Sequence, residues 1–184
     1  MHSTVRNTRR RSGGKKTGPN PTDRAKGGAK GGAKSGAKGG AKRSLQTEAQ
    51  GIPIGLVLDG ANRHDVKLVE STLVSQPPAV QQARAAWAAA GAEQNLCLDA
   101  GYDSKQVREI VAAHGYTAHI RGRGEETKAR QARQRARRWV VERTHSWLNR
   151  YRHLLIRWAK KPDNYLAMLH FACACLTWNC CLFG

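Results

Sequence analysis

The first 42 residues most constrain the fold, because they contain almost no large apolar side chain. Within them the run KGGAKGGAKSGAKGGAK repeats a four-residue unit of glycine, alanine and lysine. Such a segment cannot bury enough apolar surface to offset the entropy lost on ordering, so residues 1–42 are predicted to form a disordered basic tail. The hydrophobic core must then come from residues 43–184, a length that suits one domain.

From residue 43 onward, short apolar runs alternate with stretches of helical pattern. Strands are predicted over residues 43–48 and 52–58, which form a hairpin, and over 95–98 and 116–120. Helices are predicted over residues 66–74, 81–90 and 104–113, then from the loop at 121–124 to about 158, and from 162 onward. This alternation predicts an α/β fold in which helices cover the faces of a sheet.

The chain is strongly basic, with 32 Lys and Arg against 13 Asp and Glu and a formal net charge of +19. Such an imbalance disfavours compaction and attracts polyanions, so nucleic acid is the first partner to consider. The alternative is a basic protein whose charge only keeps it in solution.

The five cysteines do not indicate a secreted disulfide framework, because their number is odd and four lie near the C-terminal end. No C-x-x-C pair favours zinc, so reduced and buried thiols are expected. The run MHSTVRNTRRRSGGKK has charge without the apolar core of a signal peptide. Residues 165–184 are long enough to span a membrane, but His170, Thr177 and Asn179 favour a helix packed against a sheet. A cytoplasmic protein without a membrane partner is predicted.

The run ARRWVVERTHSWLNRYR, residues 136–152, carries five arginines and a single acid, Glu142. On a helical wheel, one side of this segment carries Val140, Thr144, Trp147, Leu148 and Tyr151. The other side carries Arg135, Arg138, Glu142, His145, Ser146, Asn149 and His153. By itself, Glu142 one turn after Arg138 is most simply a surface ion pair.

A second acid, Asp99, changes this interpretation, since it follows the apolar strand 95–98. Ligands of open α/β sheets gather at the carboxyl ends of the strands, although an aspartate there can also cap the next turn. Two carboxylates among arginines suit a divalent metal and a phosphodiester, because oxygen ligands bind Mg²⁺ and arginines bind phosphates. A third carboxylate is normally required, and spacing alone nominates Asp59, with Asp65 second.

Several long motifs, in order along the chain, resemble bacterial insertion-sequence transposases of the DDE type. They are KTGPNPTDR, KRSLQTE, GIPIGLVLDGANRHD, CLDAGYDS, HIRGRGEE and RRWVVERTHSWLNRYRHLLIRW. The resemblance implies an RNase H-like mixed sheet flanked by helices, and a Mg²⁺- or Mn²⁺-dependent cleavage of element ends followed by strand transfer into target DNA. It also implies that Asp99 and Glu142 are the family's second aspartate and its glutamate, with Arg138 preceding the glutamate. Asp59 is then a motif residue and not a metal ligand.

The chain departs from this family at its beginning. The family's first aspartate lies on the opening strand, and His2 stands at that position here. Losing one of three carboxylates removes a metal ligand, so the chain by itself is predicted to be weakly active or dead. Relatives carry a DNA-binding segment before this strand, so an N-terminally truncated member, or the downstream product of a frameshifted pair of reading frames, is expected.

The partners implied are the terminal inverted repeats of the element and its target DNA, in a bacterial cytoplasm and associated with the nucleoid. A homo-oligomer on DNA, or assembly with an upstream N-terminal product, is expected. Candidate DNA contacts are Lys15, Lys16, Arg138, Arg143, Asn149, Arg150 and Arg152. Two alternatives stay open: a non-enzymatic basic nucleic-acid-binding protein, and a remnant that docks on an intact transposase and interferes with it.

Overall fold

The computed structural model describes residues 2–10, 16, 18–19, 39–120 and 139–183. Its strands are β1 His2–Arg10, β2 Gly18–Pro19, β3 Gly39–Thr47, β4 Pro53–Gly60, β5 Asn95–Leu98, β6 Thr117–Ile120 and β7 Ile156–Arg157. Its α-helices are α1 Val69–Val74, α2 Pro78–Ala89, α3 Lys105–Ala113, α5 Trp139–Asn149, α6 Arg152–Leu155 and α7 Pro162–Phe183. Two short 3₁₀ helices are η1 Asp65–Leu68 and η2 Ala100–Tyr102.

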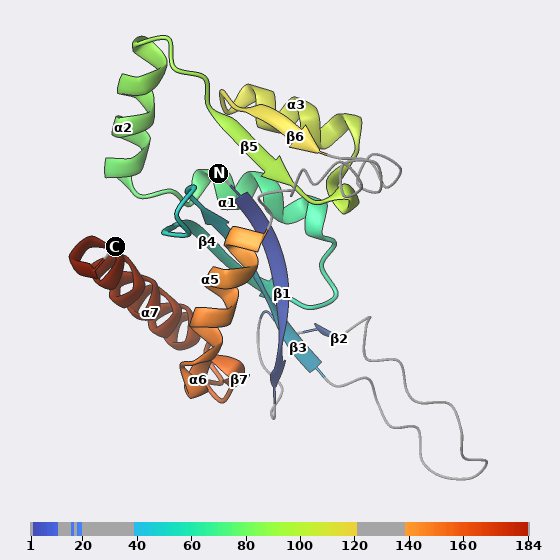
Figure 1. The fold of residues 1–184 in the computed structure, drawn as a ribbon. Helices are drawn as coiled ribbons and strands as arrows, with labels where there is room; N and C mark the ends of the chain where they lie inside the picture. Colours follow the sequence, from blue (N-terminus) through green and yellow to red (C-terminus); the bar gives the residue numbers. More distant parts are fainter. Residues whose placement is uncertain (1, 11–15, 17, 20–38, 121–138, 184) are drawn as a thin grey trace, which may run out of the picture.

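The strands form one mixed sheet. Its five longer strands lie in the order β4-β3-β1-β5-β6. β3 lies antiparallel to both β1 and β4, whereas β5 lies parallel to β1 and to β6. Figure 1 shows α5 crossing β1 with α7 beside it, while α3 runs alongside β6. The predicted α/β architecture, with helices on the faces of a sheet, is confirmed.

β1 lies at the centre of the sheet, although it falls inside the segment expected to be disordered. Its backbone pairs with β3 over eight residue pairs, beginning with His2 opposite Thr47. β3 in turn buries Ala41 and Lys42, which belong to the Gly-Ala-Lys repeat. The expectation of disorder is wrong for these two strands, because a ladder satisfies backbone hydrogen bonds without needing apolar side chains. Apart from Lys16 and β2, the rest of the expected tail lies outside the described residues.

Two hydrophobic clusters form on opposite faces of the sheet, because side chains alternate along a strand. One lies under α5 and α7 and includes Leu45 from β3 and Leu148 from α5. The other lies between the parallel strands, α1 and α3, and includes Leu96, Leu98 and Val107. Burial of each such side chain is worth about 1.5–3 kcal/mol, so both faces hold their helices firmly.

Elements with strong local signals have the bounds that the sequence predicts. β5 covers residues 95–98, and α3 begins after Ser104, whose Oγ accepts a hydrogen bond from the Val107 amide at 3.3 Å. Gly115 follows α3 with a φ of 74°, a conformation that glycine adopts without a steric penalty. These predictions are confirmed.

The Arg-rich helix is shorter than the sequence indicates, and the predicted continuation to about residue 158 is wrong. α5 ends at Asn149, and after one short helix the chain forms β7 against the end of β1. The buried guanidinium of Arg157 donates hydrogen bonds to the carbonyl groups of Ala159 and Lys16, both at 3.2 Å. A buried cation needs such partners, and the chain leaves the helix to supply them.

α5 buries a wider face than the helical wheel indicates. Val140, Thr144 and Leu148 are buried as predicted. His145, which the wheel places on the polar side, is fully buried instead, so that prediction is wrong. The reason is that α5 contacts both β1 and β3, and a helix lying across two strands covers more than a narrow stripe.

Among the described residues, α7 is the one helix that is long and apolar enough to cross a membrane. One face of α7 packs against the rest of the protein, which confirms the predicted packing for that face. The buried residues of this face are Tyr165, Leu169, Ala172 and Cys173. Only 11% of its most apolar window is buried, however, so the opposite face of α7 is open.

Gly55 in β4 generates a first prediction about stability. A Cβ atom there would lie 2.7 Å from the Thr72 carbonyl oxygen and 3.2 Å from Oε1 of Gln46. We expect Gly55→Ala to lower the free energy of unfolding by about 1–3 kcal/mol, because overpacking forces neighbouring backbone apart. Urea denaturation measures the change. Gly101→Ala is the matched control, since nothing lies within 4 Å of its Cβ position, and an unchanged midpoint for Gly55→Ala would contradict the prediction.

The two faces of α7 generate a second prediction. Burial raises the pKa of the Cys173 thiol to about 12, whereas Cys181 is exposed on the same helix. Because only the thiolate reacts, we expect iodoacetamide at about pH 9 to alkylate Cys181 and to spare Cys173 until urea is added. Peptide mass spectrometry distinguishes the two sites. As the pH rises, the Cys173 thiol ionises in the unfolded chain before it does so in the folded chain. The free energy of unfolding therefore falls between the ordinary pKa of a thiol and about pH 12. Alkylation of Cys173 in the folded chain would contradict the prediction.

Candidate active site at the carboxyl end of a central strand

Asp99 stands at the carboxyl end of β5, as the strand pattern predicts. Leu96 and Leu98 anchor the strand, because both are buried in the cluster with α1 and α3. Asp99 is partly exposed with an extended backbone, and its Oδ1 accepts a hydrogen bond from the Ala100 amide at 2.7 Å. It therefore does cap the following turn. A carboxylate has about four acceptor sites, however, so this one hydrogen bond does not exhaust its capacity for ligands.

Glu142 lies exposed in the first turn of α5. The turn between β3 and β4 fixes this part of the helix. Thr144 Oγ1 donates a hydrogen bond to the Gly51 carbonyl at 2.7 Å, and the Arg143 guanidinium donates to the Gln50 carbonyl. The helix that carries Glu142 is thus tied to the sheet at the level of its acidic residue.

The elements that carry the two predicted carboxylates lie on neighbouring strands. Leu96 and Leu98 point toward α1 and α3, and Asp99 is the first residue after β5. α5 covers the opposite face of the sheet, where it contacts β1 and β3. Because β1 lies between β3 and β5, the helix carrying Glu142 packs on the strand next to the one that ends before Asp99.

His2 opens the strand that separates these two elements. It pairs with Thr47 of β3 and with Cys97 of β5, and Cys97 precedes Asp99 by two residues. The backbone of residue 2 thus lies between the strand that ends at Asp99 and the strand that supports α5. A carboxylate-bearing residue at this position would belong to the same end of the sheet as Asp99.

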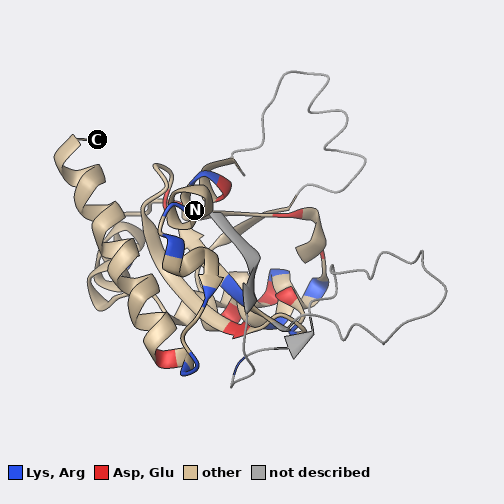
Figure 2. Cartoon of the chain, turned by 90° about the horizontal axis from the view of Figure 1, so that it is seen from below, with Lys and Arg blue, Asp and Glu red and all other residues tan. Residues whose placement is uncertain are grey.

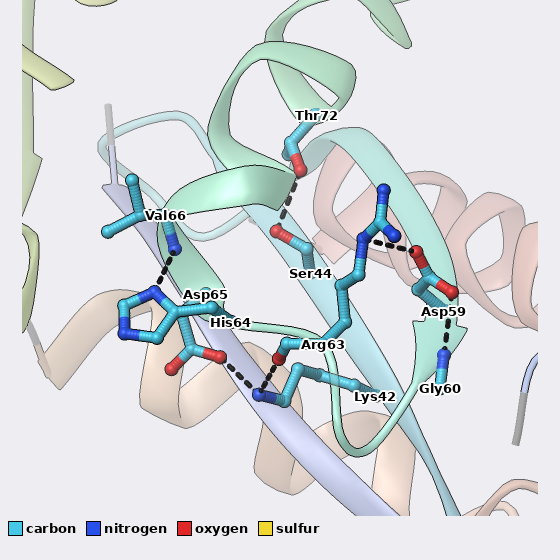
Figure 3. A network of polar contacts seen from close by, with 9 residues as sticks. All are labelled: Lys42, Ser44, Asp59, Gly60, Arg63, His64, Asp65, Val66 and Thr72. Atoms are coloured by element: carbon cyan, nitrogen blue, oxygen red, sulfur yellow. Dashed lines mark hydrogen bonds and ion pairs between the residues drawn. The ribbon is translucent and has the colours of Figure 1, made fainter. Parts of the chain in front are cut away.

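The third acid that spacing nominates lies elsewhere. Asp59 ends β4, which β3 and β1 separate from β5, a span of about 14 Å at the usual strand spacing. Figure 3 shows its carboxylate engaged by the Gly60 amide at 2.7 Å and by Arg63 at 3.5 Å. Asp59 as a third ligand beside Asp99 is therefore wrong. The spacing argument failed because it could not tell that two strands lie between β4 and β5.

Asp65, the second candidate from spacing, acts on the same phenol as Asp99. The pKa of Tyr102 is raised well above its ordinary value by burial first, then by the charge of Asp65 and then by that of Asp99. Asp65 also forms an ion pair with Lys42, whose ammonium donates to the Arg63 carbonyl at 2.6 Å (Figure 3). Sequence reasoning missed Tyr102 and Lys42. Lys42 is the last lysine of the repeat, and its position directly before the predicted strand that starts at residue 43 was the available signal.

Two of the candidate DNA contacts are packed against other side chains. The Arg143 guanidinium lies between Trp139 and Trp147, 4.7 Å from the centroid of each ring. Asn149 accepts a hydrogen bond through its Oδ1 from the buried Arg43 at 2.7 Å. The hydrogen bond from Arg43 joins the end of α5 to β3, whereas the cation–π contacts lie within α5 and hold the Arg143 side chain along the helix.

The other basic candidates are exposed or lie outside the described residues. Lys16, Arg150 and Arg152 are exposed. Lys15 and Arg138 fall outside the described ranges. Figure 2 shows that Lys and Arg occur over much of the described chain, whereas α7 has charged residues only near its beginning.

Within the described ranges, no three His, Cys, Asp or Glu side chains gather closely enough to hold a metal ion. Asp99 and Glu142 supply oxygen donors of the kind that Mg²⁺ accepts, and Mg²⁺ often binds through one or two carboxylates, with water and substrate phosphate completing its shell. The donor chemistry of these two carboxylates suits a divalent ion. They do not fit a two-ion centre formed by the protein alone.

Comparison with known proteins identifies the family of the chain. Residues 96–177, which contain both Asp99 and Glu142, match the family model described as "Transposase DDE domain", a family that generally uses divalent metal ions. A Burkholderia cepacia protein that carries the name of a transposase for insertion sequence element IS402 is 34% identical over 177 residues, which is 92% of this chain and 72% of that protein. The chain therefore belongs to the DDE transposases of bacterial insertion sequences.

Proposed function

We propose that this chain is the catalytic domain of an insertion-sequence transposase. Such a domain cleaves the ends of the insertion sequence and joins them to target DNA. The observation that supports this most directly is the position of Asp99 just after β5, next to the strand β1 against which α5, the helix of Glu142, packs. The mixed sheet with helices on both faces agrees with an RNase H-like fold. In this proposal residues 43–184 form the catalytic unit, completed by β1 from the segment before them.

In this proposal Asp99 and Glu142 hold Mg²⁺ or Mn²⁺. When bound, the ion offsets the charge of the scissile phosphodiester and polarises it. Asp99 is oriented by its hydrogen bond to Ala100, and the backbone of Glu142 is placed by the contacts that tie α5 to the sheet. The backbones that carry both carboxylates then need no ordering when DNA arrives, which lowers the entropic cost of reaching the reactive arrangement.

The basic residues bind DNA in this proposal. Exposed Lys16, Arg150 and Arg152, together with Lys15 and Arg138, contact phosphates of the terminal inverted repeats and of the target. Arg143 and Asn149 are kept as candidates, although their contacts in the structure favour a positioning role for both. The protein acts in the cytoplasm at the nucleoid, as a homo-oligomer on DNA or together with an upstream N-terminal product.

His2 limits the activity of this chain by itself. An imidazole at the first position replaces one negative oxygen ligand with a group that Mg²⁺ binds poorly. We infer that the native chain cuts DNA weakly or not at all. The alternative, a non-enzymatic basic nucleic-acid-binding protein, shares the charge and the fold but not the dependence on Asp99 and Glu142.

Restoring the missing carboxylate tests the catalytic proposal. We expect His2→Asp to raise Mn²⁺-dependent nicking of supercoiled DNA carrying the element ends by about tenfold or more, because it supplies a third oxygen ligand. Adding Asp99→Asn or Glu142→Gln to this variant should abolish the gain. Glu109→Gln is the matched control, since this glutamate lies on α3 in an exposed pair with Lys105 at 3.7 Å.

The outcomes of this experiment separate the two functions. Cutting that appears with His2→Asp and disappears with Glu142→Gln supports the transposase. Absence of cutting by every variant, together with DNA binding that weakens steeply in salt, would instead support the non-enzymatic protein. Cutting by the native chain as fast as by His2→Asp would overturn the inference about His2.

Salt-dependent DNA binding tests the assignment of the exposed arginines. Arg150→Gln and Arg152→Gln are each expected to reduce the slope of log K against log salt concentration by about one, because each removes one phosphate contact. Fluorescence anisotropy of a labelled duplex at several NaCl concentrations measures the slope. Arg108→Gln is the control, since its guanidinium pairs with Asp103 at 2.8 Å on α3. Slopes that match the control would remove both arginines from the DNA-binding surface.

A further inference from the structure

The side of α7 that faces away from the sheet is apolar and exposed. We call the residues at its centre the outer stripe: Ala167, Phe171, Ala174, Trp178 and Cys181. Phe171 and Trp178 keep 72% and 66% of their surface exposed. The members of the stripe follow one another at alternating steps of four and three residues, which is the spacing of helices that pack along a common seam.

Charge makes α7 unusual in this chain. The formal net charge is +19, yet residues 164–184 contain no Lys, Arg, Asp or Glu. Figure 2 shows this helix uncharged beyond its beginning. Two copies of so basic a protein repel each other at most approaches, and α7 offers a surface where they meet without opposed like charges.

We propose that the outer stripe pairs with the outer stripe of a second copy of this chain, with the two α7 helices antiparallel. The two-fold axis then passes close to Ala174, whose small side chain lets the helices approach. Phe171 of each copy packs against Trp178 of the other, and Cys181 of each packs against Ala167 of the other. Steps of four and three favour a crossing angle near 20°.

The antiparallel direction follows from charges at the ends of α7. Lys160 and Lys161 lie just before the helix. In a parallel pair these lysines and the positive helix N-termini of both copies would lie together. In an antiparallel pair they lie at opposite ends of a 22-residue helix, about 33 Å apart, and each N-terminus meets a C-terminus.

The area available is sufficient for a specific but reversible dimer. Two copies bring four aromatic side chains of about 150–250 Å² each, roughly two-thirds of which is still exposed. Met168 and Leu182, at 37% and 56% exposed, flank the stripe and add to it. The total is about 1,000 Å², the size at which specific interfaces begin.

A membrane is the competing occupant, because α7 is long and apolar enough to cross one. The inner face of the helix argues for the protein partner. Tyr165 is fully buried and donates a hydrogen bond to the Leu154 carbonyl at 2.7 Å, and Leu169 is fully buried beside it. A spanning helix would have to leave these contacts, whereas pairing of the outer stripe keeps them.

Sedimentation velocity of the full chain tests the pairing without DNA. After nuclease treatment and in about 1 M NaCl, where phosphate bridging is suppressed, we expect a reversible monomer–dimer equilibrium at micromolar concentrations. Phe171→Glu and Trp178→Glu should each weaken association at least about tenfold, as expected for a central aromatic side chain. The matched control is Trp87→Glu, a tryptophan 55% exposed on α2, which should leave association unchanged.

A crosslinking experiment tests the direction of the helices. In Ala167→Cys, a short bismaleimide should join Cys181 of one copy to residue 167 of the other, and adding Cys181→Ser should prevent this. A crosslink between the two Cys181 residues of the native chain would mean a parallel pair and would overturn the antiparallel arrangement. A chain that stays monomeric at about 100 µM would overturn the dimer.

Binding to lipid vesicles distinguishes a lipid-binding outer stripe from a dimer interface. If the chain is monomeric and its tryptophan emission shifts to the blue only with neutral phosphatidylcholine vesicles, the outer stripe is a lipid-binding surface and the proposal fails. None of these measurements depends on DNA cleavage. The dimer and the transposase activity are therefore tested independently.

Discussion

Hydrogen bonding along both edges of β1 is the interaction on which the rest of the structure depends. On one edge β1 forms a long antiparallel ladder with β3, and on the other it pairs in parallel with β5 at His2 and Cys97 and with β7 near its end. Outside the sheet, α1 adds a second link between the two halves, because it contacts β3, β4 and α3. Within the sheet, β1 joins the strand that ends before Asp99 to β3, against which the helix carrying Glu142 packs.

This dependence explains why a polar, arginine-rich strand can sit at the centre of a protein. Backbone groups in a ladder are satisfied whatever side chains they carry. Buried cations nearby need partners, and the structure provides them: Lys42 pairs with Asp65, and Arg43 donates to Asn149. Such contacts use charges that sequence inspection assigns to DNA. Part of the basic character of this chain is therefore structural, and the remainder is available for phosphates.

What the sequence reveals depends on whether a signal is local. β5 and α3 were predictable because their signals are local: a short, mainly apolar run indicates β5, and the Ser104 cap indicates the start of α3. Asp99 was predictable for the same reason. β1 was not predictable from its own residues, because its pairing partners lie far along the chain and its composition resembles a tail; only the family resemblance indicated an opening strand at His2. The burial of His145 and the distance between Asp59 and Asp99 are likewise set by which strands are neighbours. Family resemblance corrected Asp59 where spacing could not.

The order of strands along the chain has a consequence during synthesis. β1 leaves the ribosome before β3, its antiparallel partner, and β5 follows only after a further stretch that includes α1 and α2. At translation speeds of about 5–20 residues per second, one edge of β1 waits several seconds for its neighbour. An unpaired edge of this kind recruits other strands, and basic side chains along it oppose such recruitment by mutual repulsion.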